Sequence, residues 1–296
     1  MDIEGAGTVN IIGGNTDEES PQDLYSSIHH KVTEILRQEA DSGDINAITW
    51  LANIESLDRE MIKKVVMPLP YGIGFSKMKK NLEDELILRL QTSNLIANSS
   101  YLTRTIRDAI TKSLPKAFEV KDELVSLATY LSKYNLPIVW TTPTGFQVFQ
   151  DIRNKTNERI RATVYIKGKA ITTFYTIQAP DDSGGKIVTL EQQKKIVANF
   201  IHSFDAAHMM LTINLLLKKG VKSFATIHDS FGVHSLNVEK LNQMIRRTFY
   251  SIYKERVLDN TFADYYISFD GESSSFISDK WKSTLRSVLA AKYFFS

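Results

Sequence analysis

The sequence contains no cysteine. Disulfide bonds and thiolate metal sites are therefore excluded, and the absence fits an intracellular protein. No apolar run approaches the roughly 18 residues needed to span a membrane. The first ten residues, MDIEGAGTVN, lack the basic and apolar regions of a signal peptide. We therefore expect no membrane partner.

An excess of charge of either sign is also missing. The chain has 36 lysines and arginines against 34 aspartates and glutamates, a net charge of +2, so overall charge makes no case for a nucleic-acid partner. No repeat and no linker rich in proline, serine or glycine divides the 296 residues. With 43% hydrophobic residues, the chain can bury a substantial core, and we expect residues 1–296 to form one compact unit.

The first half of the chain is predicted to be helical. Ser20 can cap a helix that has Pro21 at its first position, and apolar residues recur on one face from Leu24 to Leu36. These signals predict an amphipathic helix over 21–38. Further helices are expected over 44–53, 82–96 and 101–133.

Hairpins alternate with helices in the second half. Residues 138–150 are typical of strand, turn and strand, and alternating segments at 158–166 and 170–179 predict a hairpin around Lys167-Gly168-Lys169. Thr189 with Gln192 predicts a capping-box start of a helix that reaches Lys219, with a break near its histidines left open. A hairpin over 222–236 and a helix over 238–257 follow. The predicted fold is α+β and helix-rich, with short antiparallel β-hairpins.

The segment ATIHDSFGVH, residues 225–234, places Asp229 at the tip of a predicted hairpin. One interpretation is a polar turn, because aspartate and serine favour turns, and for the isolated segment this is the preferred one. The other interpretation is a metal ligand. A carboxylate at the end of a rigid ribbon can reach a metal ion without burying an unpaired charge.

A basic stripe is predicted on the helix that begins near residue 58. Arg59, Lys63 and Met67 lie four residues apart and share one face. Two cations one turn apart form an unpaired positive row that suits a polyphosphate, although a solvated basic face is the simpler alternative. Pro68 and Pro70 follow, so we expect the helix to kink or end near Met67.

Two further segments carry residues of interest. HSFDAAH, residues 202–208, has the spacing His-x2-Asp-x2-His and lacks the i, i+4 histidine pair of zinc helices. Two partly buried, hydrogen-bonded histidines are the preferred interpretation there. WTTPTGFQVFQ, residues 140–150, is an aromatic-rich hairpin that packing alone would explain.

In this order the four segments resemble the C-terminal part of the single-subunit RNA polymerases of bacteriophages and mitochondria. REMIKKVVMPLPYG resembles the nucleotide-binding helix of that family, R-x3-K-x3-M-x3-YG, and WTTPTGFQVFQ its hairpin W-x-TP-x-GFPV-x-Q. FIHSFDAAHM resembles its helix F-x-HS-x-D-x-x-H, and IHDSFG its catalytic hairpin. The resemblance covers essentially the whole chain.

The resemblance implies a fingers and palm fragment of a right-hand polymerase. Residues 1–40 would hold a palm-linked helix, residues 41–135 the fingers with the nucleotide-binding helix, and residues 136–296 further fingers and palm. The last of these ranges would include the catalytic hairpin and a C-terminal foot.

The resemblance also implies roles for single residues. Asp229, flanked by His228, would be a ligand of two catalytic Mg²⁺ ions. Arg59 and Lys63 would hold the triphosphate of the incoming ribonucleotide. The remaining assignments are nucleotide binding by Met67, Tyr71 and Gly72, and contact with the primer–template pair by His208 with His202 as a helper.

A second catalytic carboxylate is expected on another chain. The family supplies it from a motif like DGxxxGxQH, which this sequence lacks and which would lie just upstream of Met1. We therefore expect one subunit of a split RNA polymerase, with a partner subunit, a DNA template, an RNA product and ribonucleoside triphosphates. The expected location is the cytoplasm of an infected host cell or the virion, with the mitochondrion as the alternative.

Two other functions stay open. The first is a non-catalytic nucleic-acid-binding subunit or polymerase relic, which would have no reason to keep Arg59, Lys63, Tyr71 and Asp229 together. The second is a fragment of a family A DNA polymerase, which shares the R-x3-K-x7-YG spacing. That family usually has an aromatic residue where this chain has Met67 and Glu where it has Ser230, so these positions favour RNA synthesis.

Overall fold

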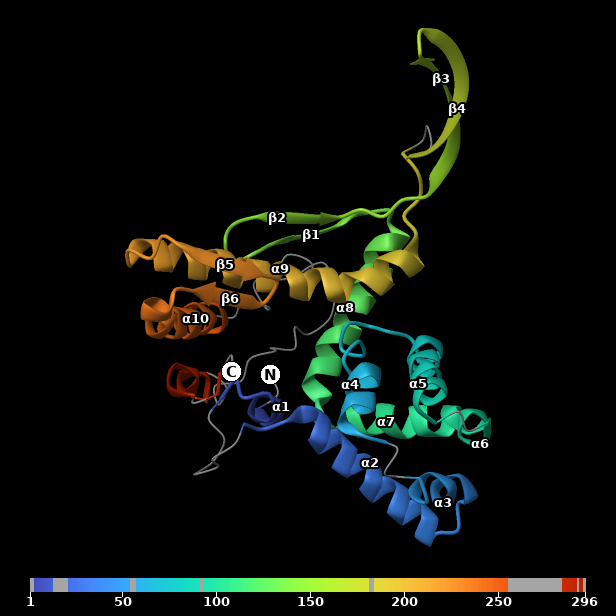
Figure 1. The fold of residues 1–296 in the computed structure, drawn as a ribbon, viewed down its shortest axis with the longest axis vertical. Coiled ribbons are helices and arrows are strands. Elements are labelled where there is room, and N and C mark those ends of the chain that lie inside the picture. The colour runs from blue at the N-terminus through green and yellow to red at the C-terminus, as the bar shows by residue number, and fades with distance from the viewer. Residues whose placement is uncertain are drawn as a thin grey trace.

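The computed structural model describes residues 3–12, 21–53, 57–90, 93–180, 184–254, 284–291 and 293–294. These residues form a helix-rich α+β fold with three two-stranded antiparallel sheets, as the sequence predicted. Figure 1 shows a group of helices at the bottom, a layer built on one long helix above it, and a β-hairpin that projects from the top.

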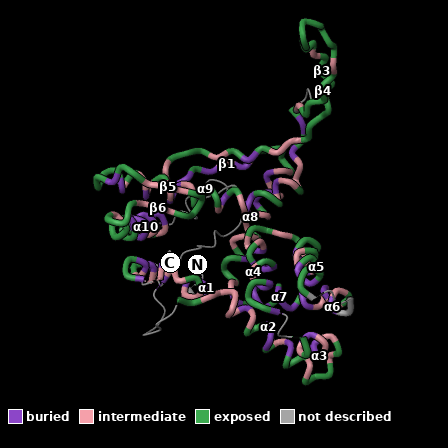
Figure 2. Tube along the Cα trace, in the orientation of Figure 1, coloured by how far each residue is buried: buried purple, intermediate pink, exposed green. Residues whose placement is uncertain are grey.

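The lower group packs around one hydrophobic core. Its largest fully buried side chains include Trp50, Met61 and Leu82, and buried positions face inward from each long helix of the group (Figure 2). The group comprises α2 (Leu24–Asp41), α3 (Ile45–Leu51), α4 (Arg59–Val66), α5 (Phe75–Leu90), α6 (Ser93–Ala97) and α7 (Ser99–Ser113).

Helix α8 (Pro115–Lys133) connects this core with a second one. Phe118 near its start belongs to the first core, whereas Leu127 and Leu131 pack with Trp140 in the second. The predicted helix over 101–133 is therefore two helices. Leu114, with φ −129° and ψ 53°, interrupts it because a residue before proline is disfavoured in the helical region.

Helix α9 (Thr189–Lys218) is the longest element, with 30 residues, and it runs without the break left open near its histidines. It packs against α8 and against α10 (Val238–Tyr253). A third core lies where the end of α9 meets α10 and the C-terminal residues; Leu216, Met244 and the short helix η3 (Arg286–Ala290) contribute to it, as does Ala6 of α1 (Ile3–Thr8).

In the described part of the chain, α9 is also the one helix that is long and apolar enough to cross a membrane. Its buried residues, such as Ile196 and Phe204, pack with α8 residues, and Leu216 packs with α10 residues. Of the apolar window in this helix, 33% is buried inside the fold.

The predicted start of α2 and the predicted capping box of α9 are wrong, although α9 does begin at Thr189. Helix α2 begins at Leu24, because the side chain of Asp23 caps it by accepting hydrogen bonds from the backbone N–H groups of Tyr25 and Ser26. The helix therefore starts three residues after Pro21, and Ser20 lies outside the described residues. Helix α9 has Val188 as its cap residue with no side-chain hydrogen bond, so the predicted capping box at Thr189 does not form.

Gln192 is instead part of a buried amide pair that joins α9 to strand β2 (Gln147–Gln150), which itself pairs with β1 (Ile138–Thr141). The Gln150 Nε2 atom donates to Oε1 of Gln192 at 2.6 Å, and Gln192 Nε2 donates to the Gln150 backbone oxygen at 2.9 Å. Asn199 Nδ2 also donates to Gln150 Oε1, at 2.9 Å. These bonds fix the β1–β2 hairpin on the helix.

The projecting arm in Figure 1 is the hairpin of β3 (Lys155–Ile166) and β4 (Lys169–Pro180). It is longer than the predicted segments and turns through Lys167 and Gly168, both with positive φ as a type I′ turn requires. On one face of the arm, Ile160 pairs with Tyr175 and Val164 pairs with Ile171, and all four of these side chains are exposed. The arm is therefore an amphipathic ribbon that no described element covers.

The amide pair predicts a specific loss of stability. Gln192→Leu should destabilise the fold by about 1–3 kcal/mol, because two buried hydrogen bonds are lost: the one from Gln150 Nε2 to Gln192 Oε1 and the one from Gln192 Nε2 to the Gln150 backbone oxygen. Chemical unfolding monitored by circular dichroism measures this. Gln243→Leu, at an exposed position where the amide contacts only Glu239, should change the stability by less than about 0.5 kcal/mol. Equal effects of the two changes would contradict the role of the pair.

Candidate active site

Asp229 lies at the tip of the predicted hairpin. Strands β5 (Phe224–Ile227) and β6 (Ser230–Val233) pair in antiparallel register and leave a two-residue loop of His228 and Asp229. His228 has φ 54°, a conformation that few non-glycine residues adopt. The loop holds the Asp229 side chain at the exposed end of a paired ribbon.

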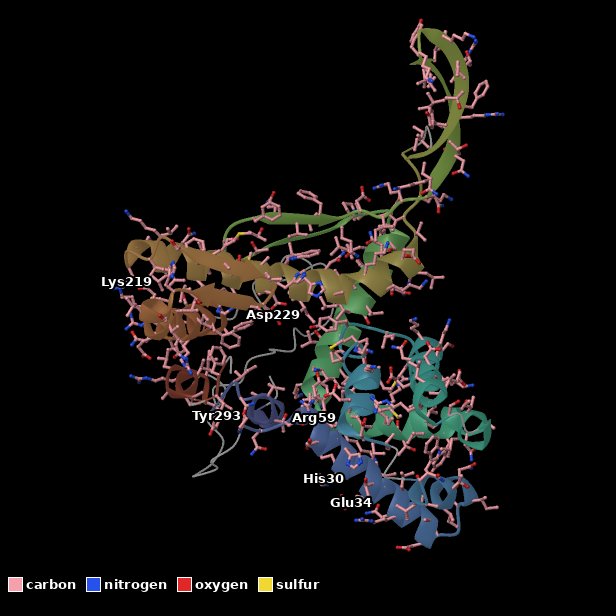
Figure 3. All side chains as sticks on the ribbon, viewed as in Figure 1. His30, Glu34, Arg59, Lys219, Asp229 and Tyr293 are labelled. Atoms are coloured by element: carbon pink, nitrogen blue, oxygen red, sulfur yellow. The ribbon has the colours of Figure 1, made fainter. Side chains whose placement is uncertain are left out.

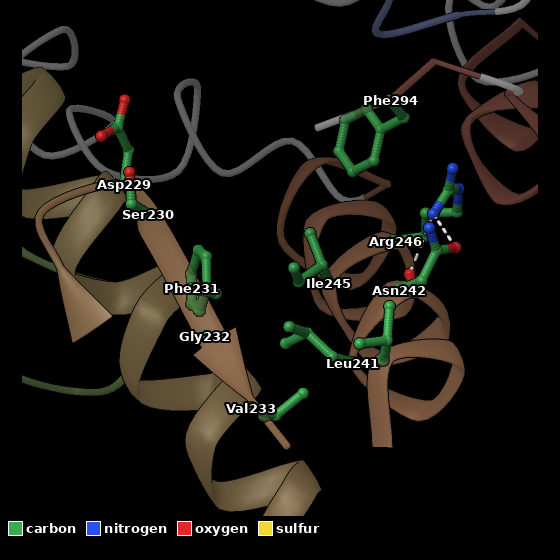
Figure 4. Close-up of a pocket in the computed structure, with 11 residues that line it drawn as sticks. Asp229, Ser230, Phe231, Gly232, Val233, Leu241, Asn242, Ile245, Arg246 and Phe294 are labelled. Carbon is green, nitrogen blue, oxygen red and sulfur yellow. Dashed lines mark hydrogen bonds between the residues drawn. The ribbon is translucent and has the colours of Figure 1, made fainter. Parts of the chain in front are cut away.

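A cavity of about 600 Å³ begins at this carboxylate. Figure 4 shows Asp229 and Ser230 at one end and Arg246 at the other, with apolar side chains of β6 and α10 between them. Phe294 covers the far end, where Arg246 donates to the backbone oxygen of Ala291 at 2.7 Å and to the side chain of Asn242. The cavity is thus apolar in the middle and charged at both ends.

Helix α9 brings a second carboxylate into the neighbourhood of Asp229. Burial raises the pKa of Asp205, the negative charge of Asp229 raises it further, and His202 acts in the opposite direction. Asp205 and Asp229 therefore interact electrostatically, although they belong to different motifs. Sequence reasoning assigned no role to Asp205. The signal that was available is its position three residues after His202, which places both on one face of the helix.

His208 is in the core. Its side chain is 7% exposed, Nε2 donates to the Ile245 backbone oxygen at 3.0 Å, and the rings of Phe231 and Phe249 meet it edge-on. Burial lowers the pKa of His208 and outweighs the opposing effect of the hydrogen bond, so the imidazole is neutral at pH 7. The prediction of a partly buried, hydrogen-bonded histidine is therefore confirmed for His208. It is wrong for His202, which is exposed. Contact of either with a primer–template pair stays a prediction.

The basic helix ends just before Pro68, as the sequence predicted. Helix α4 stops at Val66 with Met67 as its C-cap, and its buried residues lie opposite the exposed Arg59 and Met67. The expectation of an unpaired positive row is wrong, because Arg59 forms ion pairs with Asp23 and Glu60. Lys63 lies with Nζ 6.0 Å from the centre of the Tyr25 ring.

Tyr71 connects the basic helix to α9. Its ring centre lies 5.5 Å from that of His202, and the next residue, Gly72, has φ 92°, which favours glycine. Burial raises the pKa of the Tyr71 hydroxyl, and the charges of Asp205 and Asp229 add to this effect. The structure therefore brings Tyr71 together with His202 and the two carboxylates. Arg59 and Lys63 precede Tyr71, on α4 itself. Figure 3 shows Arg59 on the lower group of helices, below Asp229.

The described residues supply only part of a metal site. Asp229 offers the exposed carboxylate oxygens that Mg²⁺ prefers. Within the described ranges, however, no group of three or more histidine, cysteine, aspartate or glutamate side chains could hold a metal ion. Two Mg²⁺ ions do not fit these residues alone.

The candidate site thus combines a basic helix, an aromatic residue after it and an exposed carboxylate on a hairpin tip. Comparison with known proteins identifies the family. The model of the DNA-dependent RNA polymerase family matches residues 1–293, so the chain belongs to this family, the single-subunit polymerases of phage and mitochondrial type.

Similar proteins come from plants. The chain is 28% identical over 299 residues to the mitochondrial DNA-directed RNA polymerase 1B of Nicotiana tabacum, covering 99% of this chain and 28% of that protein. It is also 28% identical to the mitochondrial DNA-directed RNA polymerase 1 of Arabidopsis thaliana, covering 99% of this chain and 29% of that protein. With DNA-directed RNA polymerase 2A of Nicotiana tabacum it shares 27% identity, and there it covers 85% of the relative. The chain thus spans less than a third of the first two.

The buried histidine predicts a pH dependence of stability. Because the pKa of His208 is lower in the folded chain than its ordinary value of 6.5, the unfolded chain takes up a proton that the folded chain does not. The stability contribution is therefore fully present above about pH 6.5 and is lost as the pH falls toward the folded-state pKa. His208→Gln should reduce the slope of unfolding free energy against pH between 6.5 and 5, by at most about 1.4 kcal/mol per pH unit.

Urea unfolding at a series of pH values measures that slope. His202→Gln, on the same helix but exposed, retains His208 and should keep the part of the slope that His208 causes. An unchanged slope in His208→Gln would show that this imidazole is not the group responsible.

Proposed function

We propose that this chain contributes the nucleotide-binding helix and one metal-binding aspartate to an enzyme that joins ribonucleotides into RNA on a DNA template. The observation that carries the proposal is the meeting of three motifs around Tyr71. Tyr71 follows the basic helix, and its ring centre lies 5.5 Å from that of His202 on α9. The negative charge of Asp229, on the β5–β6 hairpin, contributes to raising the pKa of the Tyr71 hydroxyl. Tyr71 lies more than 100 residues before His202 and Asp229 in the sequence, and these two residues are 27 positions apart.

In this proposal α4 binds the incoming ribonucleoside triphosphate. Lys63 and Arg59 contact the phosphates, where positioning and charge stabilisation supply most of the catalysis of phosphoryl transfer. Met67 and Tyr71, both exposed at the end of the helix, lie beside the base and sugar, and Gly72 allows the chain to turn there. His202 and His208 are proposed to act at the growing end of the RNA, His208 by holding α9 against α10.

Asp229, with His228 beside it, is the proposed metal ligand. Asp229 would hold Mg²⁺ together with a second carboxylate, and a two-metal site of this kind would supply activation of the 3′-hydroxyl group and charge stabilisation of the leaving pyrophosphate. Since the described residues lack a complete site, we propose that another carboxylate comes from a partner subunit that carries the first catalytic aspartate. The low net charge of this chain is compatible with a partner that provides much of the nucleic-acid channel.

The location is a proposal as well. The relatives are named as mitochondrial or chloroplastic enzymes, which supports the mitochondrial alternative. The cytoplasm of an infected host cell and the virion stay predictions.

The proposal predicts that Asp229 is indispensable. The chain, co-purified with a partner that carries the first catalytic aspartate, should synthesise RNA from a DNA template in the presence of Mg²⁺. Asp229→Asn should lower the rate by more than about 100-fold, because even the groups that only orient metal ligands are worth 10- to 100-fold. Incorporation of labelled ribonucleotides measures the rate, and size-exclusion chromatography checks that the complex still assembles.

Asp84→Asn is the control, since this residue is exposed on α5. Normal activity in the Asp229→Asn complex would refute the assignment. RNA synthesis by the chain alone would refute the need for a partner. A preference for deoxyribonucleotides would favour a DNA polymerase.

A further inference from the structure

We propose that Asp23 is a positioning residue that acts through Arg59: its carboxylate holds the guanidinium group in the nucleotide-free chain and competes with an incoming triphosphate for it. Asp23 thereby sets the affinity for the nucleotide. The inference rests on the proposed role of α4 in binding triphosphate, and it adds a residue to which the family motifs assign no function.

The contact between the two side chains is bidentate. Arg59 Nε lies 2.6 Å from Oδ2 of Asp23, and Nη2 lies 3.1 Å from Oδ1. The third nitrogen, Nη1, lies 2.6 Å from Oε1 of Glu60. Every nitrogen of the guanidinium group therefore already donates to a carboxylate. These bonds use three of the five N–H donors, and Asp23 occupies the whole Nε–Nη2 edge. A phosphate group that binds Arg59 bidentately at this edge therefore has to replace Asp23.

Asp23 is held more firmly than an ordinary surface partner. It is the N-cap of α2, and its Oδ2 accepts hydrogen bonds from the Ser26 backbone N–H at 3.2 Å and from Ser26 Oγ at 2.5 Å. Tyr25, two residues on, places its ring 5.5 Å from the guanidinium carbon of Arg59. The start of α2 thus fixes the acceptor, and α4 supplies the cation from its first turn.

The charge on Asp23 persists wherever the enzyme is expected to work. Partial burial acts to raise its pKa, but the hydrogen bonds from Arg59 and Ser26 outweigh it and lower the pKa to about 2. A change of pH in the physiological range does not release Arg59. Release requires a competing anion, and a triphosphate offers several oxygens to a cation that binds phosphate bidentately.

Variants that remove the charge but keep the helix cap test this inference. Asparagine and serine both cap helices well, so Asp23→Asn and Asp23→Ser should leave α2 intact. Binding of inorganic tripolyphosphate to the full chain, measured by calorimetry without metal at about 0.15 M ionic strength, should become roughly fivefold tighter in both variants. Asp23→Glu, which restores a carboxylate, should return the affinity toward that of the wild type.

Asp58→Asn is the matched control. Asp58 is likewise an N-cap, of α4, and it likewise forms an ion pair with an arginine, Arg89, at 2.5 Å. Within the described part of the chain, the ion pairs of the Arg59 guanidinium are with Asp23 and Glu60 and not with Asp58, so neutralising Asp58 should change the affinity by less than about twofold. A similar gain in Asp58→Asn would reduce the effect of Asp23 to general electrostatics and overturn the inference.

The double variant separates the inference from the proposed function. In an Arg59→Gln background, Asp23→Asn should have no further effect, because the cation that Asp23 holds is gone. Weaker binding in Arg59→Gln, with no tighter binding in Asp23→Asn, would overturn the role of Asp23 and leave the triphosphate site standing. If Arg59→Gln binds tripolyphosphate as well as the wild type does, both the role of Arg59 and the inference fail.

Discussion

The site depends on the packing of helix α9 between α8 and α10. The first half of α9 buries Phe200 and Phe204 with residues of α8, while its last turns pack with α10. Along its length the helix presents His202 to Tyr71, Asp205 to the carboxylate of Asp229, and His208 to the core. One rigid element of 30 residues therefore sets the spacing of groups that come from three motifs. The unbroken helix is what makes that spacing fixed.

Periodicity and turn chemistry predicted most of the fold. The hairpins and the end of α4 followed from local rules, because Pro68 forbids a continuing helix and the Lys167–Gly168 loop suits a two-residue turn. The predicted start of α2 and the predicted capping box of α9 failed because other partners were available. Gln192 has its amide in the buried pair with Gln150, and the position of Asp23 as the cap of α2 depends on bonds to Ser26. Such competition between partners is not encoded in spacing.

For the candidate site, the sequence predicted on which element and face each residue lies better than it predicted what surrounds that residue. Arg59 and Met67 do lie on the exposed face of α4, as their spacing of four implies. The pairing of Arg59 with Asp23 joins residues 36 positions apart, and no local pattern predicts such a contact. The same applies to Asp205, whose interaction with Asp229 arises only when α9 and the β5–β6 hairpin are brought together.

The two halves of the candidate site belong to different cores. The cations lie on α4, whose buried face is part of the first core, whereas Asp229 lies on a hairpin supported by the core of α9 and α10. Helix α8 joins the first core to the second, α9 continues from the second to the third, and the contact of Tyr71 with His202 links the α4 region to α9 directly. A rotation of one core on the other would separate positive from negative charge with little change inside either. The geometry of the site is thus determined by how firmly α8 and the Tyr71–His202 contact hold the cores together.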